Sequence, residues 1–133
     1  MKYKNLLIVL LILIIITLSG CGTDKDSSDS GYTKITAKEA KEMMDQDSTI
    51  TILDVRTEEE YNTGHIEGAI LIPDTEISDK AEETLTDKSA AILVYCRSGR
   101  RSALAAADLV ELGYSKVYDF GGITDWEYDI VTE

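Results

Sequence analysis

Residues 90–112 read AAILVYCRSGRRSALAAADLVEL and combine three patterns in one stretch. Residues 90–95 form a continuous apolar run, which is typical of a strand buried on both faces of a sheet. Residues 102–112 are rich in alanine and predict a mostly buried helix. Its expected apolar face is marked by Ala103, Ala106, Ala107 and Val110 and is widened by Leu104, Ala105, Leu109 and Leu112. A strand that runs through a short polar loop into a helix indicates one unit of a parallel α/β sheet.

Two capping boxes predict further helices upstream of this stretch. Residues 36–39 read Thr-Ala-Lys-Glu and residues 57–60 read Thr-Glu-Glu-Glu. In such a box the threonine hydroxyl and the glutamate carboxylate satisfy free amide groups at a helix start. We expect the first helix to run to about residue 46 and the second, shorter one to end near residue 64. Residues 79–85 predict a third helix, polar and at the surface.

The remaining strands complete the expected fold. They are predicted at residues 49–55, 69–72 and 116–120, where apolar and β-branched side chains are concentrated. After the last strand, Gly121 and Gly122 lead into a final turn or helix that carries Trp126. This alternation of strands and helices predicts an α/β domain, with a central parallel sheet and helices on both faces.

Length, charge and composition exclude several classes of protein. The 133 residues suffice for one domain. Asp and Glu number 25 against 13 Lys and Arg, so the formal charge is −12. Such an acidic chain repels nucleic acid and anionic lipid head groups, and neither is an expected partner. Two cysteines and one histidine argue against a disulfide scaffold, a cysteine-rich zinc site and a histidine metal site.

The N-terminus has the pattern of an export signal. Lys2 and Lys4 precede the apolar residues 6–18, a run of 13 residues in which one threonine is the sole polar side chain. A membrane-spanning helix needs about 20 apolar residues, so the run is interpreted as the core of a signal peptide. Residues 18–21, Leu-Ser-Gly-Cys, resemble the bacterial lipobox, in which the cysteine is lipidated. The alternative is an uncleaved, short membrane anchor.

This interpretation divides the chain into three parts. Residues 1–20 are the expected lipoprotein signal peptide. Residues 21–31 follow as a flexible acidic linker that starts at the lipidated Cys21, because a polar stretch without apolar side chains cannot offset its ordering entropy. Residues 32–133 are the expected folded domain, extracytoplasmic and anchored to the cell membrane by the lipid. Lipidation of Cys21 leaves Cys96 as the one free thiol.

Cys96 directly follows the predicted central strand, where ligands bind in open α/β sheets. Arg97, Arg100 and Arg101 lie within the next five residues, although the mature chain has only one other arginine, Arg56. A helix N-terminus offers unpaired amides and about half a positive charge, and nearby guanidinium groups add to it. The pattern therefore predicts a site for a thiolate and an anion. The alternative is a cysteine that acts as a small buried hydrophobe.

The chain resembles the rhodanese family of sulfurtransferases over nearly all of residues 32–133. One matching segment is the loop at residues 96–102, Cys-Arg-Ser-Gly-Arg-Arg-Ser. The other matching residues are Asp54-Val55-Arg56, Glu60-Tyr61, Gly64-His65-Ile66-Glu67-Gly68-Ala69, and Gly121-Gly122 with Trp126.

The resemblance implies a persulfide mechanism and a set of site residues. The catalytic residue would be Cys96, which takes a sulfane sulfur from a small anionic donor such as thiosulfate and passes it to a thiol or cyanide. Arg97 and Arg101 would bind the anionic part of the donor, Asp54 and Arg56 would brace the loop, and His65 would be structural. The implied substrate-binding residues are Arg97, Ser98, Gly99, Arg100, Arg101 and Ser102. No metal or organic cofactor is implied, and we expect a monomer.

Two other functions fit parts of the same pattern. Phosphatases and arsenate reductases of related fold place five residues between the cysteine and an arginine, whereas here that position is Ser102 and Arg101 comes one residue early. A non-catalytic sulfur carrier or partner-binding module would use the same fold. Inactive relatives typically lack the cysteine, and this chain keeps it.

Overall fold

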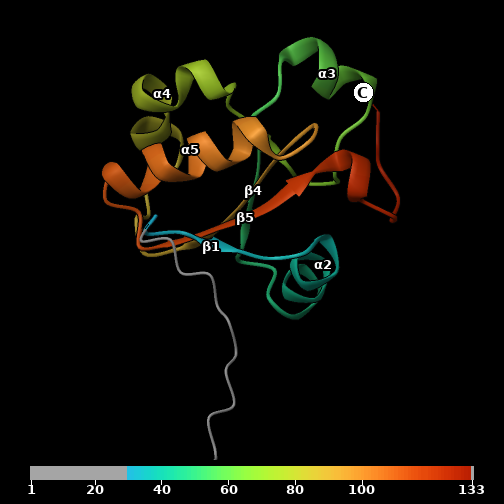
Figure 1. Cartoon of the computed structure of the whole chain (residues 1–133), viewed down its shortest axis with the longest axis horizontal. Coiled ribbons are helices and arrows are strands. Elements are labelled where there is room, and N and C mark those ends of the chain that lie inside the picture. Colours follow the sequence, from blue (N-terminus) through green and yellow to red (C-terminus); the bar gives the residue numbers. More distant parts are fainter. Residues whose placement is uncertain (1–29, 133) are drawn as a thin grey trace, which may run out of the picture.

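The computed structural model describes residues 30–132, and its centre is a five-stranded sheet (Figure 1). The strands are β1 (Thr33–Lys34), β2 (Thr51–Asp54), β3 (Ile70–Leu71), β4 (Ala91–Cys96) and β5 (Lys116–Gly122). Their order is β1-β5-β4-β2-β3, and every neighbouring pair is parallel. The carboxyl ends of all five strands therefore lie at one edge of the sheet, as the sequence pattern predicted.

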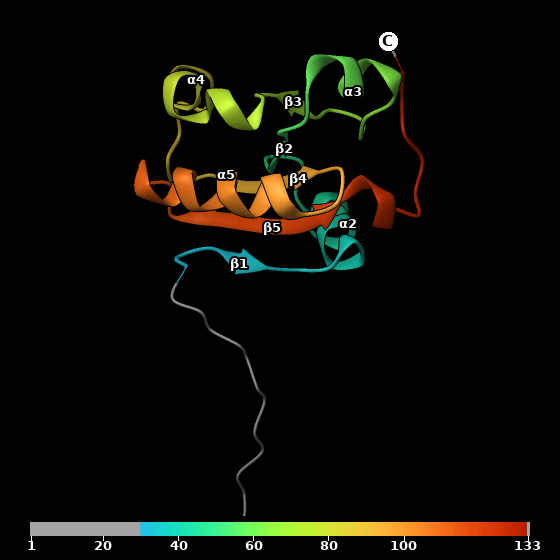
Figure 2. The same cartoon turned by 45° about the horizontal axis from the view of Figure 1, so that its top comes forward.

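Within residues 30–132, four α-helices and one 3₁₀ segment connect the strands, and a second 3₁₀ segment follows the last strand. The helices are α2 (Ala37–Gln46), α3 (Glu58–Thr63), α4 (Ile77–Thr84) and α5 (Arg100–Glu111). The 3₁₀ segments are η2 (Asp74–Glu76) and η3 (Ile123–Asp125). Figures 1 and 2 show α4 and α5 along one face of the sheet and α2 at the other face. The expected α/β fold, with a parallel sheet between helices, is confirmed.

Each face of the sheet has its own hydrophobic core. Under α4 and α5, side chains such as Val94, Ala106 and Leu109 are fully buried, and Cys96 belongs to this cluster. On the opposite face Leu93 packs in a cluster that also contains Trp126 of the C-terminal segment. Successive residues of a strand point to opposite faces, so β4 contributes to both cores and is the most deeply buried strand. This explains its continuous apolar sequence.

Both predicted capping boxes are present. Thr36 and Glu39 exchange bonds at the start of α2, where the Glu39 amide donates to the threonine hydroxyl at 3.2 Å and the Glu39 carboxylate accepts from the Thr36 amide at 2.7 Å. Thr57 and Glu60 do the same at the start of α3, at 3.2 and 3.0 Å. Local sequence thus determines where these two helices begin.

The structure differs from the sequence expectation at α5. The helix begins two residues earlier than predicted, because Gly99 adopts a left-handed conformation (φ +100°) that turns the chain directly into it. Its buried side chains are Ser102, Ala105, Ala106 and Leu109, of which the last three belong to the predicted apolar face, whereas Ala103, Ala107 and Val110 are only partly buried. Leu104 is 57% exposed, and the helix is less buried than expected. The two-residue strand β1 was not predicted, because two residues carry no periodicity.

The expected signal peptide and nearly all of the expected linker lie outside the described residues. Of the linker, the structure describes Ser30 and Gly31. Across residues 30–132, no helix is both long and apolar enough to cross a membrane.

The end of β5 lies directly against the loop that follows β4. At Gly122, a Cβ atom would lie 2.2 Å from the Arg97 carbonyl oxygen and 2.6 Å from the Ser98 Cα. The hydroxyl of Thr124 donates to the same Arg97 carbonyl at 3.1 Å. Backbone therefore packs on backbone here, and the conformation of the loop after Cys96 depends on the absence of a side chain at position 122.

We predict that Gly122→Ala destabilises the domain by about 3 kcal/mol or more, because the added methyl group meets backbone that cannot rotate away. Gly121→Ala is the matched control, since its φ of +86° is strained for alanine but the space around it is open. That control should cost about 1–2 kcal/mol. Urea unfolding of both variants measures the difference, and equal stability of the two would contradict the close approach.

Candidate active site

Cys96 is the last residue of β4 and lies at the carboxyl edge of the sheet. The loop of residues 97–99 leaves this edge and returns as the first turn of α5, so the N-terminus of the helix faces the sulfur. Cys96 is only 1% exposed. The loop and the helix therefore enclose the thiol.

Hydrogen-bond donors surround the sulfur. The Gly99 amide donates to the Cys96 Sγ at 3.0 Å, and the Ser102 hydroxyl lies 3.6 Å from it. Burial raises the pKa of the Cys96 thiol, but hydrogen bonds from the Ser102 hydroxyl and from the amides of Ser102, Gly99 and Ser98 outweigh it. The pKa consequently lies below that of an ordinary cysteine. Cys96 is buried, yet its surroundings favour the thiolate, which a purely hydrophobic role does not require.

Ser102 connects the sulfur to the backbone around it. Its side chain is buried, and its hydroxyl lies 3.1 Å from the Gly99 carbonyl oxygen and 3.3 Å from that of Gly121. The hydroxyl thus contacts the loop, the end of β5 and the sulfur at once. A small hydroxyl residue at this position fits the space better than a long side chain.

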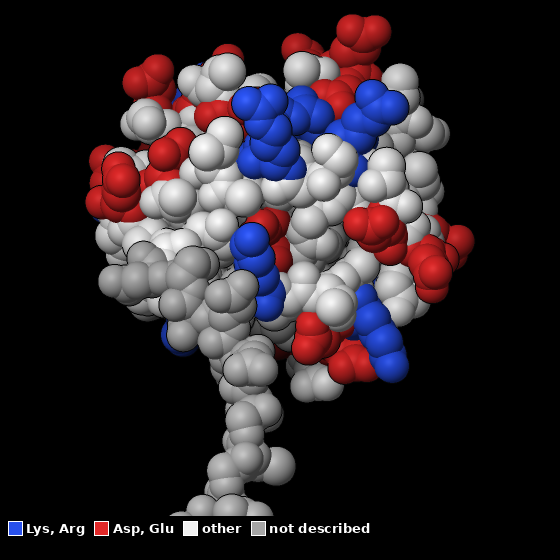
Figure 3. All heavy atoms as spheres, in the orientation of Figure 1, with Lys and Arg blue, Asp and Glu red and all other residues white. Residues whose placement is uncertain are grey.

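The three loop arginines have different surroundings. Arg97 and Arg100 are exposed, whereas Arg101 is partly buried. Figure 3 shows Lys and Arg side chains gathered over the N-terminal end of α5, between α3 and α4, on a molecule whose other visible charges are largely acidic. The site therefore has a local positive charge, as the sequence predicted.

Arg101 is held by Glu60, which the sequence predicted as a capping residue and as part of a segment that resembles the rhodanese family. Its Nη1 and Nη2 atoms each lie 2.8 Å from an oxygen of Glu60, 41 residues away in sequence. The hydrogen bond with Arg101 lowers the pKa of Glu60 to about 2, so the carboxylate is charged at any ordinary pH. The sequence contains one indication of this pair. Glu60 lies in the first turn of the helix that follows β2, and β2 is the neighbour of β4, which leads into the helix that carries Arg101.

Asp54 and Arg56 form a buried ion pair beside the site. Arg56 Nη2 lies 2.6 Å from Asp54 Oδ2 and also donates to the Gly64 carbonyl oxygen at 2.7 Å. Next to them, the Tyr95 hydroxyl accepts a hydrogen bond from the Ile66 amide at 3.1 Å. The pair thus ties β2 to the turn after α3, next to β4, and does not contact the sulfur. The bracing of the Cys96 loop expected of these two residues stays a prediction, because the bonds of the pair go to β2 and to the turn after α3.

His65 is part of the same turn and packs as a structural residue. Its ring stacks on that of Tyr61 with centroids 3.6 Å apart, and its Nδ1 lies 3.0 Å from the Tyr61 carbonyl oxygen. Among residues 30–132, no group of three or more His, Cys, Asp or Glu side chains is arranged to hold a metal ion.

Comparison with known proteins gives a consistent result. The model of the rhodanese-like domain family matches residues 36–129. The thiosulfate sulfurtransferase PspE of Escherichia coli is 40% identical over 73 residues, which are 55% of this chain and 70% of that protein. The putative sulfur carrier protein YrkF of Bacillus subtilis is 35% identical over 106 residues. These are 79% of this chain but 56% of YrkF, so the chain spans little more than half of that relative.

A solved structure, a rhodanese with anions from E. coli, aligns with a TM-score of 0.60 and 36% identity. The alignment covers 63% of this chain and 99% of that one. The family match includes β2 to β5, the loop of residues 97–99 and the N-terminus of α5, which are the elements that enclose Cys96. With its fold, its buried cysteine and these similarities, the chain belongs to the rhodanese-like domain family.

Proposed function

We propose that the domain is a sulfurtransferase that moves a sulfane sulfur from thiosulfate or a similar donor to a thiol or cyanide. The carrier is a persulfide on Cys96. The observation that supports this most directly is the position of the Cys96 sulfur at the N-terminus of α5. There the sulfur accepts a hydrogen bond from the Gly99 amide at 3.0 Å, and Cys96 is almost fully buried. Relatives named as thiosulfate sulfurtransferases add support.

The proposed reaction has two half-reactions. In the first, the Cys96 thiolate attacks the outer sulfur of the donor, a new S–S bond forms, and sulfite leaves with the electron pair of the broken S–S bond. In the second, an acceptor thiolate or cyanide attacks the outer sulfur of the persulfide, and Cys96 leaves as a thiolate. Electrons and atoms balance without a metal or an organic cofactor.

Each loop residue has a proposed part in these steps. The amides of residues 97–102 and the Ser102 hydroxyl stabilise negative charge on the bound sulfur. The exposed Arg97 and Arg100 attract the anionic donor, and Arg101 offsets charge near Cys96. Because Cys96 is 1% exposed, we infer that side chains over the thiol move aside to admit the donor, while the loop backbone keeps its packing on Gly122.

The phosphatase alternative is weaker. Such enzymes need an arginine that clamps the oxyanion, whereas the residue at that place is Ser102 and the nearest arginine, Arg101, is paired with Glu60. The non-catalytic sulfur carrier differs from the proposed enzyme only in the second half-reaction. It draws support from the relative named as a putative sulfur carrier.

Treatment with thiosulfate should add about 32 Da, one sulfur atom, to the peptide that contains Cys96. Cys96→Ser should abolish both this gain and transfer to cyanide while the unfolding midpoint changes little, since the two side chains are nearly isosteric. Mass spectrometry and a thiocyanate assay measure the two steps. A mass gain without turnover would favour the sulfur carrier, and phosphate release from an aryl phosphate without any mass gain would favour a phosphatase.

The lowered pKa of Cys96 leads to a prediction about pH. A thiol with a lowered pKa is ionised at lower pH, so alkylation of Cys96 by iodoacetamide should reach its plateau at a lower pH than alkylation of a cysteine peptide. Ser102→Ala removes a hydrogen bond to the thiolate and should move the midpoint upward. Ser98→Ala is the matched control. This variant keeps the backbone amide of residue 98 that faces the sulfur, so the alkylation midpoint of Cys96 should equal that of the wild type. A wild-type midpoint at or above that of the peptide would contradict an activated thiolate.

We also propose that residues 1–20 are a lipoprotein signal and that the lipidated Cys21 anchors the domain to the outer face of the cell membrane. The support is the sequence pattern, since these residues lie outside the described part of the chain. The full-length protein produced in bacteria should incorporate labelled palmitate and fractionate with membranes, and Cys21→Ser should lose the label. A wild-type chain without label would refute the anchor.

A further inference from the structure

Glu60 occupies a junction between three parts of the site. Its carboxylate accepts hydrogen bonds from the Thr57 amide at 3.0 Å and from the Thr57 hydroxyl at 3.1 Å. The same carboxylate accepts hydrogen bonds from the Nη1 and Nη2 atoms of Arg101, each at 2.8 Å. The start of α3 is thereby joined to the first turn of α5, on which the loop around Cys96 depends.

Arg101 is committed to this partner. Both Nη atoms are used by Glu60, and the two side chains are each 28% exposed. The negative charge of a Cys96 thiolate also acts on this guanidinium, as does that of Asp74 in η2. Arg101 therefore lies close enough for its charge to act on the sulfur. Its end-on pair of Nη donors is already used by Glu60, so a second anion would meet a guanidinium whose charge is largely balanced.

We propose that Glu60 is a positioning residue, which holds Arg101 beside Cys96 so that the guanidinium stabilises the thiolate and leaves capture of the donor to Arg97 and Arg100. The proposal rests on the function proposed above and refines it. It assigns Arg101 a different task from the donor binding that the sequence suggested. It also gives the capping glutamate of α3 a second role.

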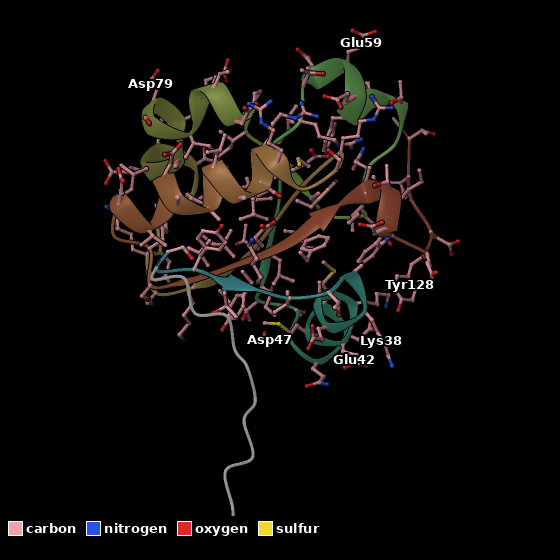
Figure 4. All side chains as sticks on the ribbon, in the orientation of Figure 1. Lys38, Glu42, Asp47, Glu59, Asp79 and Tyr128 are labelled. Carbon is pink, nitrogen blue, oxygen red and sulfur yellow. The ribbon has the colours of Figure 1, made fainter. Side chains whose placement is uncertain are left out.

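The acidic first turn of α3 supports a specific role for this one glutamate. Glu58, Glu59 and Glu60 are consecutive, and the first two are exposed. Figure 4 shows Glu59 at the outer side of α3, pointing away from the molecule. Of the three, Glu60 is the one that bonds to Arg101. The capping box holds the Glu60 carboxylate in place independently of that bond. Glu59 is therefore a control with the same charge at nearly the same place.

Glu60 can affect the ionisation of Cys96 in two ways: directly through its own negative charge, or indirectly through Arg101. The charged groups that act on Arg101 are Glu60 of α3, the Cys96 thiolate and Asp74 of η2. Acting directly, the Glu60 carboxylate would disfavour a thiolate, and its removal would make ionisation of Cys96 easier. Acting through Arg101, it favours the thiolate, and its removal would make ionisation harder. The two effects have opposite signs.

The test is the pH profile of Cys96 alkylation by iodoacetamide, a neutral probe whose approach the arginine charges do not steer. The full-length chain is used, and labelling at Cys96 is read by peptide mass spectrometry. We expect Glu60→Gln and Arg101→Met each to move the midpoint to higher pH, and Glu59→Gln to leave it unchanged. In the Arg101→Met background, Glu60→Gln should produce no further upward movement. A midpoint that stays or falls in Glu60→Gln would overturn the proposal.

Transfer kinetics with thiosulfate provide a second readout. Glu60→Gln and Arg101→Met should lower kcat with little change in KM, whereas Arg97→Ala and Arg100→Ala should raise KM, roughly two- to tenfold. A rise in KM alone for the Glu60 or Arg101 variant would refute the division of tasks. If the wild-type chain forms no persulfide, the proposed function fails, but the alkylation profile still decides whether Glu60 positions Arg101.

Discussion

A sulfur atom that is 1% exposed can carry a negative charge only when protein groups replace the hydrogen bonds that water would supply. In this domain the replacement comes from the backbone at the start of α5 and from the Ser102 hydroxyl. Backbone amides can reach the sulfur because Gly99 turns the chain sharply into the helix. The requirement for these amides explains why the loop has small residues between its arginines.

The same requirement extends to parts of the chain that never contact Cys96. Gly122 must lack a side chain, because its Cα lies against the Arg97 carbonyl and the Ser98 backbone. Glu60 holds Arg101 from α3, and the Asp54–Arg56 pair fixes the turn that follows that helix. A buried ion pair adds little net stability, but it strongly penalises arrangements that separate its partners. Here the pair holds β2 and the turn after α3 together.

Charge is distributed unevenly, and the distribution suits an anionic substrate. The chain carries a formal charge of −12, yet two exposed arginines lie within four residues of Cys96. The acidic remainder disfavours polyanions such as nucleic acid, while a small dianion can approach the local positive charge within a Debye length of about 10 Å. The same charge distribution thus explains why we propose a small anionic donor and why we do not expect nucleic acid as a partner.

The sequence by itself determined the α/β class, the two capping boxes, the central strand and the place of Cys96 at its end, because each depends on residues within a few positions of one another. It also placed three arginines near the thiol. It did not reveal that Arg101 binds Glu60, that Gly122 packs on the loop, or that Ser102 is part of the buried face of α5. These depend on contacts between residues distant in the chain, such as the 41 residues that separate Glu60 from Arg101. Strand order and helix packing decide such contacts, and local patterns do not encode them.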